Sequence, residues 1–307
     1  MNMFTITIPA SSANIGPGFD SAGIALSRYL SLHVTKQETW EFVHHSSHLP
    51  FVSHYEDHFI YHAAKQIAEV YNHVLPPCKV EVDSEIPLAR GLGSSASAVI
   101  AGIELANQLC SLSLTLEQKL NHATVLEGHP DNAAPIIFGG FLITANTGDG
   151  EIDYFEMPPL DLDVVLYIPD FKMSTETARN LLPASFSRKN ATTASGISNM
   201  MIAAFVSGDY LLAGRMMEKD LFHEPYRAEL IPNYDEIKVE AKKLGAYGTV
   251  ISGAGSAMIS FVPKGQGNQI AAQMKAMLPQ YDIAPLKIDH HGLQVSHCEK
   301  PLRMTAE

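Results

Sequence analysis

An α+β fold in two halves is the fold class that the sequence predicts. Its predicted helices and strands do not alternate strictly, as they would in a doubly wound parallel sheet, and 307 residues are enough for two packed domains. The pattern of strands and helices also restarts after Pro158 and Pro159. We therefore expect an N-terminal domain over residues 1–157 and a C-terminal domain over residues 158–307.

The N-terminal half is expected to begin with two strands that flank a turn-rich loop. Residues 4–8 and 29–34 alternate apolar and polar side chains, and PASSANIGPGFD lies between them. Apolar residues then recur at helical spacing over 59–71, and 78–82 returns to the strand period. A segment rich in Gly and Ser follows directly.

A helix is predicted from Ser94 to Leu109, because apolar residues recur there every three or four positions. Thr115 and Gln118 match a capping box, which indicates the start of the next helix. The apolar run 136–145 is expected to be a buried strand. Further elements are expected in the second half, as strands at 164–168, 247–252, 257–262 and 282–288 and as helices near 175–182, 192–206, 209–218, 234–244 and 267–278.

Composition and charge describe a soluble globular protein. Hydrophobic residues make up 46% of the chain and charged residues 18%, which is too apolar for a disordered chain. The net charge of -12 argues against nonspecific binding to nucleic acid or to an acidic membrane. Any anionic ligand must therefore be held by local donors against the field of the whole chain.

The cysteines and the N-terminal residues indicate a cytoplasmic protein. Cys78, Cys110 and Cys298 are odd in number and form no C-x-x-C pair, as is typical of reduced thiols. Arg28 is the first basic residue, so no positively charged segment precedes an apolar signal core. No apolar run approaches the roughly 18 residues of a membrane span.

The segment PLARGLGSSAS has the composition of an anion-binding loop. A helix start exposes four unpaired N–H groups and a partial positive charge, and glycines before it let phosphate oxygens approach the backbone. Successive amides around Gly91 to Ser94 can wrap phosphate, and serine hydroxyls are hard oxygen donors for Mg²⁺. The residues assigned to this phosphate site are Pro87, Leu88, Ala89, Arg90, Gly91, Leu92, Gly93, Ser94, Ser95, Ala96 and Ser97.

Three other interpretations of this segment compete with phosphate binding. A Walker loop needs a lysine after its glycines, and none is present. Residues 91–96 match G-x-G-x-x-A, but a second helix follows where a dinucleotide-binding unit needs a strand with an acidic residue about 20 positions on. The third is a tight turn whose small residues serve helix packing, and the length of the Gly/Ser run favours phosphate binding over it.

Four segments, in order, resemble the signatures of the GHMP kinases, the superfamily of galacto-, homoserine, mevalonate and phosphomevalonate kinases. PLARGLGSSAS resembles the phosphate-binding signature. PASSANIGPGFD (9–20) resembles the N-terminal signature of the homoserine kinase branch, EGHPDNAAPIIFGG (127–140) its central segment and SGAGS (252–256) its C-terminal glycine turn. The resemblance covers the length of the chain.

The resemblance implies a two-domain fold, with a left-handed βαβ unit in the N-terminal α+β domain and a ferredoxin-like C-terminal domain. It also implies ATP-dependent phosphorylation of the L-homoserine hydroxyl, giving O-phospho-L-homoserine on the route to threonine, with Mg²⁺ as the cofactor. It is compatible with a homodimer. The alternatives are another GHMP kinase, such as a mevalonate-pathway kinase, and a nucleotide-binding regulator without catalysis.

The resemblance assigns metal binding and catalysis to the loop and the central segment. Ser95 and Glu127 correspond to the magnesium ligands of the family, although only one residue separates Glu127 from His129 here, where many relatives have several more. Asp131 corresponds to the aspartate that takes the hydroxyl proton in mevalonate-type relatives. Because a loose phosphoryl transfer leaves little covalent chemistry to the protein, a group such as Asn132 that orients the hydroxyl could suffice.

A zwitterionic substrate needs an acceptor for its ammonium and a cationic clamp for its carboxylate. Asn14 and Asp20 suit the ammonium, while the resemblance assigns Arg179 and Arg227 to the carboxylate, which guanidinium groups bind in a fork. Thr175, one helical turn before Arg179, would face the same pocket. The remaining substrate contacts are assigned to His129, Asn132, Gly253 and Gly255.

The adenine base is expected to lie against His58, Phe59 and Ile60, where the family more often has an asparagine in place of His58. His54, His58 and His62 would stack on one helix face at i, i+4 and i+8, as metal ligands can. His54 is, however, expected to precede the helix. We therefore interpret these histidines as structural.

Overall fold

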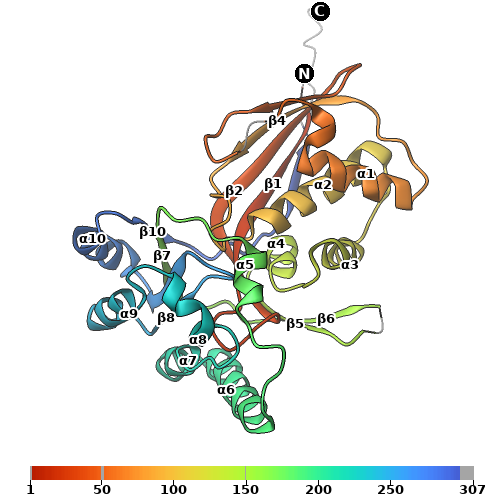
Figure 1. Cartoon of the computed structure of the whole chain (residues 1–307). Helices are drawn as coiled ribbons and strands as arrows, with labels where there is room; N and C mark the ends of the chain where they lie inside the picture. Colours follow the sequence, from red (N-terminus) through yellow and green to blue (C-terminus); the bar gives the residue numbers. More distant parts are fainter. Residues whose placement is uncertain (1, 50–51, 149, 298–307) are drawn as a thin grey trace, which may run out of the picture.

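The computed structural model describes residues 2–49, 52–148 and 150–297, without the side chains of Asn2 and Thr175. The described part of the chain forms two sheets, one of seven strands and one of four. Figure 1 shows most of the large sheet in the upper half of the molecule, with helices packed beside it, and the small sheet with its own helices in the lower half. The predicted α+β fold class is confirmed.

The large sheet is formed mainly by the N-terminal half. Its strands are β1 (Asn2–Ala13), β2 (Ala22–Lys36), β3 (Glu41–His44), β4 (Cys78–Ser84), β5 (Phe141–Asn146), β6 (Ile152–Glu156) and β11 (Gln294–His297). The main order is β11-β1-β2-β4-β3, and β5 pairs with β2 and forms a hairpin with β6. The pairs are antiparallel except β3 with β4.

Four helices pack around the large sheet, and the central one is enclosed on all sides. They are α1 (Phe59–Val70), α2 (Ser94–Cys110), α3 (Leu116–Glu127) and α4 (Ala133–Phe138), with the 3-10 turn η1 (Tyr55–Asp57) before α1. Helix α2 contacts β1 and has α1 and α3 beside it, and its residues from Val99 to Asn107 are all buried. A helix enclosed in this way has no polar face. Its N-terminus is therefore fixed in position relative to β1.

The small sheet belongs to the second half. Its strands are β7 (Leu162–Ile168), β8 (Gly248–Ile251), β9 (Met258–Pro263) and β10 (Asp282–Leu286), in the antiparallel order β10-β7-β9-β8. Helices separate β7 from β8 and β9 from β10, which is the split βαβ pattern of ferredoxin-like domains. They are α5 (Thr175–Asn180), α6 (Arg188–Ser207), α7 (Tyr210–Met217), α8 (Glu224–Arg227), η2 (Ala228–Leu230), α9 (Tyr234–Lys243) and α10 (Gly267–Met277).

Both faces of the small sheet are buried, in two different cores. Along β7, Val164 and Leu166 point into the core shared with the large sheet, whereas Val165 and Tyr167 point into a second core with α9 and α10. This alternation is the two-residue period of a strand. In the described part of the chain, no helix has the length and apolar character that a membrane span requires.

The structure corrects some of the predicted elements. The capping box of Thr115 and Gln118 is confirmed. The predicted strand 136–145 is wrong, because α4 occupies its first part and β5 starts only at Phe141. A short apolar run that is buried on every side carries no period that separates helix from strand. Strands β3, β6 and β11 were not predicted. The domain boundary at 157 stays a prediction, and β11 pairs with β1 in the large sheet.

Candidate active site

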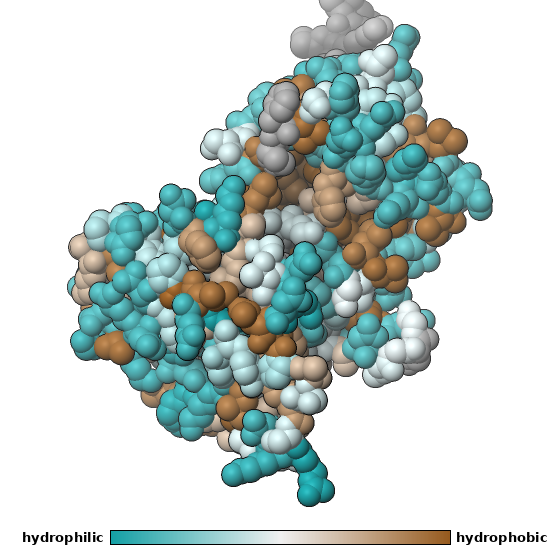
Figure 2. Space-filling model, viewed as in Figure 1, coloured by the Kyte–Doolittle hydropathy of each residue, from teal (hydrophilic) through white to brown (hydrophobic). Residues whose placement is uncertain are grey.

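A cavity of about 630 Å³ lies where the two halves meet. Figure 2 shows a recess between the upper and lower halves, with apolar side chains in it. Three groups of residues line the cavity. The Gly/Ser loop contributes Leu88, Ala89 and residues 91–98. A mostly apolar group includes Leu30, His44, Leu49, Val52, His58, Phe59, Ile60 and Ile86. A polar group includes Asn14, Asp20, Glu127, His129, Asp131, Asn132, Arg179, Arg227 and Gly253.

Gly91 and Gly93 give the loop a backbone that other residues would disturb. Their φ angles are +76° and +68°, and Gly93 is the N-cap of α2. A Cβ on Gly91 would lie 2.0 Å from the carbonyl oxygen of Ser252, and a Cβ on Gly93 would lie 2.2 Å from Ser11 Oγ. The two glycines therefore let the loop pack directly on the 252–256 turn and on β1.

The loop brings glycines, serines and small apolar residues to the cavity, and no cationic side chain. Ser252 Oγ donates a hydrogen bond of 2.7 Å to the carbonyl of Gly91, which fixes the loop to the second half. The side chain of Arg90 turns away and donates from Nε to the carbonyl of Pro169 at 3.1 Å. Neither Arg90 nor Pro87 lines the cavity. An anion at this loop would thus meet the amides at the start of α2.

Ser95 and Glu127 meet at the edge of this loop. Ser95 lies in the first turn of α2, and its Oγ donates a hydrogen bond of 2.7 Å to Oε1 of Glu127, the last residue of α3. Burial raises the pKa of the Glu127 carboxyl, and the hydrogen bond from Ser95 opposes that rise. A hydroxyl and a part-buried carboxylate side by side are hard oxygen donors, and they would fit a magnesium ion.

Asp131 is the centre of a hydrogen-bonded cluster. His129 Nδ1 lies 2.5 Å from Asp131 Oδ1, and the amide and side-chain nitrogens of Asn132 donate to the same oxygen at 2.9 and 3.4 Å. Burial disfavours the charged imidazolium, but the hydrogen bond to Asp131 and the charge of Asp131 outweigh it and raise the pKa of His129. Ser11 Oγ donates to Asn132 Oδ1 at 2.8 Å. The cluster is therefore rigid.

Asp20 and Arg179 bind each other across the cavity. Arg179 donates from Nη2 to Asp20 Oδ1 at 2.7 Å and from Nη1 to Oδ2 at 3.2 Å, so the contact is a two-pronged fork. The amide of Asp20 donates to Asn14 Oδ1 at 3.1 Å. One oxygen of Asp20 also lies within 4.8 Å of ligand atoms of His129 and Asp131. The predicted ammonium acceptor and one predicted carboxylate ligand thus form an ion pair.

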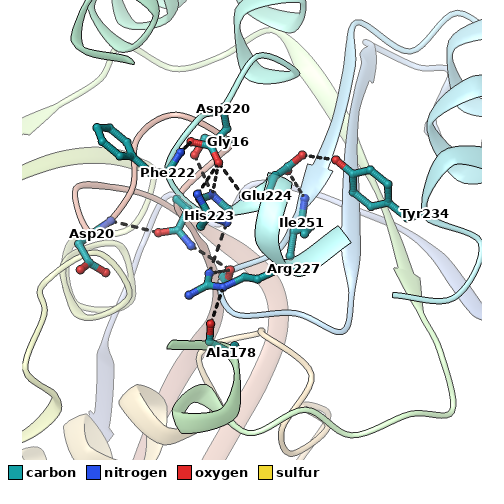
Figure 3. Close-up of polar contacts among 12 residues, drawn as sticks. Gly16, Asp20, Ala178, Asp220, Phe222, His223, Glu224, Arg227, Tyr234 and Ile251 are labelled. Atoms are coloured by element: carbon teal, nitrogen blue, oxygen red, sulfur yellow. Dashed lines mark hydrogen bonds and ion pairs between the residues drawn. The ribbon is translucent and has the colours of Figure 1, made fainter. Parts of the chain in front are cut away.

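Arg227 is held inside the protein by carbonyl groups. Its side chain is 2% exposed, and it donates from Nε to Ala178 at 3.2 Å and from Nη1 to Gly253 at 3.2 Å. Burial and the charge of Arg179 lower the pKa of Arg227 to about 10, so it remains a cation at neutral pH. Figure 3 shows the guanidinium between Ala178 and His223. A buried cation beside a cavity favours binding of an anionic ligand.

Sequence reasoning did not find Phe19 or His223. The Phe19 ring stacks on the His223 ring at 5.5 Å, and the guanidinium carbons of Arg179 and Arg227 lie 5.8 and 5.6 Å from its centroid. The Phe19 ring thus lies within cation–π distance of both arginines. Phe19 lies inside PASSANIGPGFD, quoted above, and His223 begins the segment HEPYR, which ends at Arg227. Neither residue carries a spacing signal that assigns it a role.

His58 caps α1 and sits in an aromatic cluster. Its Nδ1 accepts from the amide of Ile60 at 3.2 Å, its Nε2 lies 2.9 Å from His44 Nε2, and Phe42 stacks on it at 4.0 Å. Burial lowers the pKa of His58 to about 4, with smaller contributions from His44 and His62. Because both ring nitrogens of His58 already have partners, its expected role in reading adenine has no support in these contacts. Phe59 is 52% exposed and lines the cavity.

Some predicted residues are not brought to the cavity. Gly255 does not line it, although its neighbour Gly253 does. Thr175 begins α5, but its side chain lies outside the described atoms. His54 precedes the turn η1, so the three-histidine stack does not form on one helix. Within the described residues, metal-ligating side chains gather in a group of three at Asp20, His129 and Asp131.

Comparison with known proteins shows the family of this chain. The family model described as GHMP kinases N terminal domain matches residues 58–140, and the one described as GHMP kinases C terminal matches residues 201–280. The chain belongs to the GHMP kinase family. A homoserine kinase from Oceanobacillus iheyensis is 50% identical over 96% of this chain and 99% of its own length. A homoserine kinase from Bacillus velezensis is 44% identical over 94% of each chain.

A solved structure of a homoserine kinase is also similar to this chain. The crystal structure of a homoserine kinase from Cytophaga hutchinsonii superposes with a TM-score of 0.83 at 26% identity, and the match covers 96% of this chain and 98% of that chain. The two-domain GHMP kinase fold expected from the resemblance is therefore confirmed.

Proposed function

We propose that this protein is a homoserine kinase, which transfers the γ-phosphoryl group of ATP to the side-chain hydroxyl of L-homoserine and gives O-phospho-L-homoserine and ADP. One observation carries the proposal. A single cavity joins an amide-lined anion loop to Asp20, Arg179 and Arg227, which are the charges a zwitterion requires. The names of the relatives that match nearly the whole chain support the same activity.

The nucleotide is proposed to lie along the loop. Amides from Gly91 to Ser94 bind the phosphates at the positive end of α2, which compensates for the net charge of -12. The apolar side of the cavity, with Phe59 and Ile86, takes the adenine base. Phosphate contacts then come from residues 1–157, while substrate contacts come from both sides of that predicted boundary.

Magnesium is proposed to be held by Ser95 Oγ and the Glu127 carboxylate. When bound, it neutralises charge on the β- and γ-phosphate oxygens. The short link between Glu127 and His129 brings this ligand pair close to the Asp131 cluster.

The substrate is proposed to displace the ion pair of Asp20 and Arg179. Its ammonium then binds Asp20, and its carboxylate binds the guanidinium groups of Arg179 and Arg227. The two new ion pairs replace the internal one, so no charge is left without a partner. The side-chain hydroxyl lies beside Asp131 and Asn132, in line with the γ-phosphate.

Asp131 is proposed to orient the hydroxyl and not to act as a strong base. Its Oδ1 accepts from His129 and from two nitrogens of Asn132, which stabilise the negative charge of the carboxylate. A loose transition state requires little removal of the proton before the phosphoryl group moves. Positioning then supplies most of the rate enhancement.

Cytoplasmic location is part of the proposal. Cys78 and Cys110 are free in the structure, and burial raises the pKa of Cys78 to about 12, which keeps it an unreactive thiol. Homodimer formation stays a prediction.

The activity is tested by mixing the purified protein with ATP, Mg²⁺ and L-homoserine. Phosphorus NMR should show a new phosphomonoester that forms in equal amount to ADP, and the product should co-migrate with O-phospho-L-homoserine. ADP release that does not depend on homoserine would contradict the proposal and would favour a nucleotide-binding protein with another role.

A further inference from the structure

His223 is a buried histidine that the proposed reaction does not use. It precedes α8 in the segment HEPYR and has an exposed fraction of 0%. Its Nε2 lies 2.9 Å from the carbonyl oxygen of Gly16, and its Nδ1 lies 3.3 Å from Nη1 of Arg227. Figure 3 shows the imidazole between these two partners. The ring therefore links the loop after β1 to a residue of the candidate active site.

These two contacts define one tautomer. A carbonyl oxygen can only accept, and a guanidinium nitrogen can only donate. His223 must therefore carry its proton on Nε2, donate it to Gly16 and offer the lone pair of Nδ1 to Arg227. Asp220 lies 3.6 Å from Nε2, and its carboxylate already accepts from the amides of Phe222, His223 and Glu224. Nδ1 of His223 is thus an acceptor aimed at the guanidinium of Arg227.

The contacts of Arg227 show what this acceptor fixes. Nε donates to Ala178, and Nη1 donates to both Gly253 and His223. Three of the five N–H groups are then committed, and within the described residues Nη2 has no protein partner. Since Arg227 lines the cavity, Nη2 is the nitrogen that remains for a ligand. Without the Nδ1 acceptor, the planar guanidinium could turn about its Cδ–Nε bond, and Nη2 would lose this direction.

We infer that His223 is a positioning residue, which fixes the guanidinium of Arg227 so that Nη2 meets the carboxylate of the substrate. The inference rests on the proposed function, because it assigns that carboxylate to an amino-acid substrate. The Phe19 ring supports the arrangement, since it stacks on His223 at 5.5 Å and lies 5.6 Å from the Arg227 guanidinium carbon. His223 touches no reacting atom and acts only through Arg227.

Two substitutions separate the acceptor role of Nδ1 of His223 from the donor role of Nε2. The amide of asparagine ends where Nδ1 lies, so His223→Asn keeps an acceptor for Arg227 and loses the donor to Gly16. The amide of glutamine reaches the place of Nε2, so His223→Gln keeps the donor and loses the acceptor. We expect His223→Gln to raise the KM for L-homoserine about tenfold, as loss of one hydrogen bond to a charged group does. His223→Asn should raise it less than about threefold.

The readouts distinguish positioning from loss of structure. In both variants, the KM for ATP and kcat should change less than about twofold. In an Arg227→Lys background, His223→Gln should raise the KM for homoserine by less than about twofold more, because the guanidinium that His223 positions is absent. Matched controls are His122→Asn and His122→Gln, at a part-buried histidine that bonds to Tyr71 away from the cavity. These should leave every constant unchanged.

The outcomes decide the matter. Three results would each overturn the role of His223. The first is an equal rise of the KM for homoserine in His223→Asn and His223→Gln, and the second is a full tenfold rise from His223→Gln in the Arg227→Lys background. The third is a rise of the KM for ATP as large as that for homoserine. If neither variant folds, a crystal structure of the wild-type protein with L-homoserine decides, and it must show the carboxylate on Nη2 with Nδ1 still on Nη1. An inactive wild-type protein would overturn the proposed function itself, whereas an active one with equal variants overturns only this inference.

Discussion

The hydroxyl of Ser95 donates a hydrogen bond of 2.7 Å to the carboxylate of Glu127. This contact joins the first turn of α2 to the last residue of α3, 32 positions further along the chain. Both oxygens line the cavity beside the Gly/Ser loop. Ser95 and Glu127 would hold a magnesium ion at this point, and the ion would neutralise phosphate charge.

Ser95→Ala removes one of these ligands and should lower kcat/KM about 100-fold. The loss should be partly reversed by raising the Mg²⁺ concentration, because Glu127 remains. Initial rates over a magnesium titration check this expectation. Activity close to that of the wild type at low magnesium would show that Ser95 is not a ligand.

Gly91→Ala should disrupt the loop. The new Cβ would lie 2.0 Å from the carbonyl oxygen of Ser252, and φ is +76°, so we expect a loss of about 1–3 kcal/mol in stability and much weaker ATP binding. The matched control is Gly196→Ala, in the interior of α6, where a Cβ meets no atom within 4 Å. It should raise stability by up to about 1 kcal/mol and leave ATP binding unchanged. Thermal unfolding and calorimetric titration measure both, and similar behaviour of the two variants would contradict the account.

The sequence predicted the parts of the fold and site that depend on local signals. The capping box at Thr115 and the helix that starts at Ser94 follow from short-range hydrogen bonding and period, and the structure contains both. Ser95 and Glu127 were assigned by resemblance, and the structure brings them into contact. These features could be predicted because the conformation of a glycine and the start of a helix depend on a few neighbouring residues.

The parts that depend on tertiary contacts could not be predicted. The ion pair of Asp20 and Arg179 joins residues 159 positions apart, and no sequence period reports such a contact. Residues 136–138 belong to the helix α4 and not to the predicted strand 136–145, because burial on all faces removes the sequence period that separates helix from strand. The role of Phe19 depends on contacts of its ring with Arg179 and Arg227, which are distant in the sequence.

Asp20→Asn should reduce selectivity for an amino-acid substrate. In the wild type, 4-hydroxybutanoate must break the ion pair of Asp20 and Arg179 and offers no ammonium in return. The substitution removes this penalty and also weakens homoserine binding. The ratio of kcat/KM for homoserine to that for 4-hydroxybutanoate should fall at least about tenfold. An unchanged ratio would remove Asp20 from the ammonium site.

Asp131→Asn should lower kcat about tenfold, the loss expected when a carboxylate only orients the hydroxyl. Asparagine keeps the shape of the side chain but loses the charge that pairs with His129. Single-turnover kinetics with saturating ATP and homoserine measure the transfer step directly. A fall of about 10⁴-fold or more would establish Asp131 as a general base instead.

His58 should make the fold less stable in acid. Its folded-state pKa is about 4 and its ordinary value is 6.5, so between these values the unfolded chain binds the proton more readily. The contribution of His58 to the free energy of unfolding is complete above about pH 6.5 and is lost as the pH falls toward 4. The loss between about pH 7 and about pH 5 is roughly 2 kcal/mol.

His58→Asn tests this pH dependence, because asparagine also caps a helix but does not titrate. Urea unfolding at the two pH values should show a smaller loss for the variant than for the wild type, by roughly the same 2 kcal/mol. Parallel losses in the two proteins would show that His58 does not contribute.

The central claim is that this cavity selects a zwitterionic hydroxy amino acid for phosphorylation. The most direct measurement is kcat/KM for ATP-dependent ADP release with L-homoserine, mevalonate, galactose and serine under the same conditions. The arginine pair and Asp20 predict that L-homoserine exceeds each of the others by about 100-fold or more. A higher value for mevalonate or galactose would contradict the account.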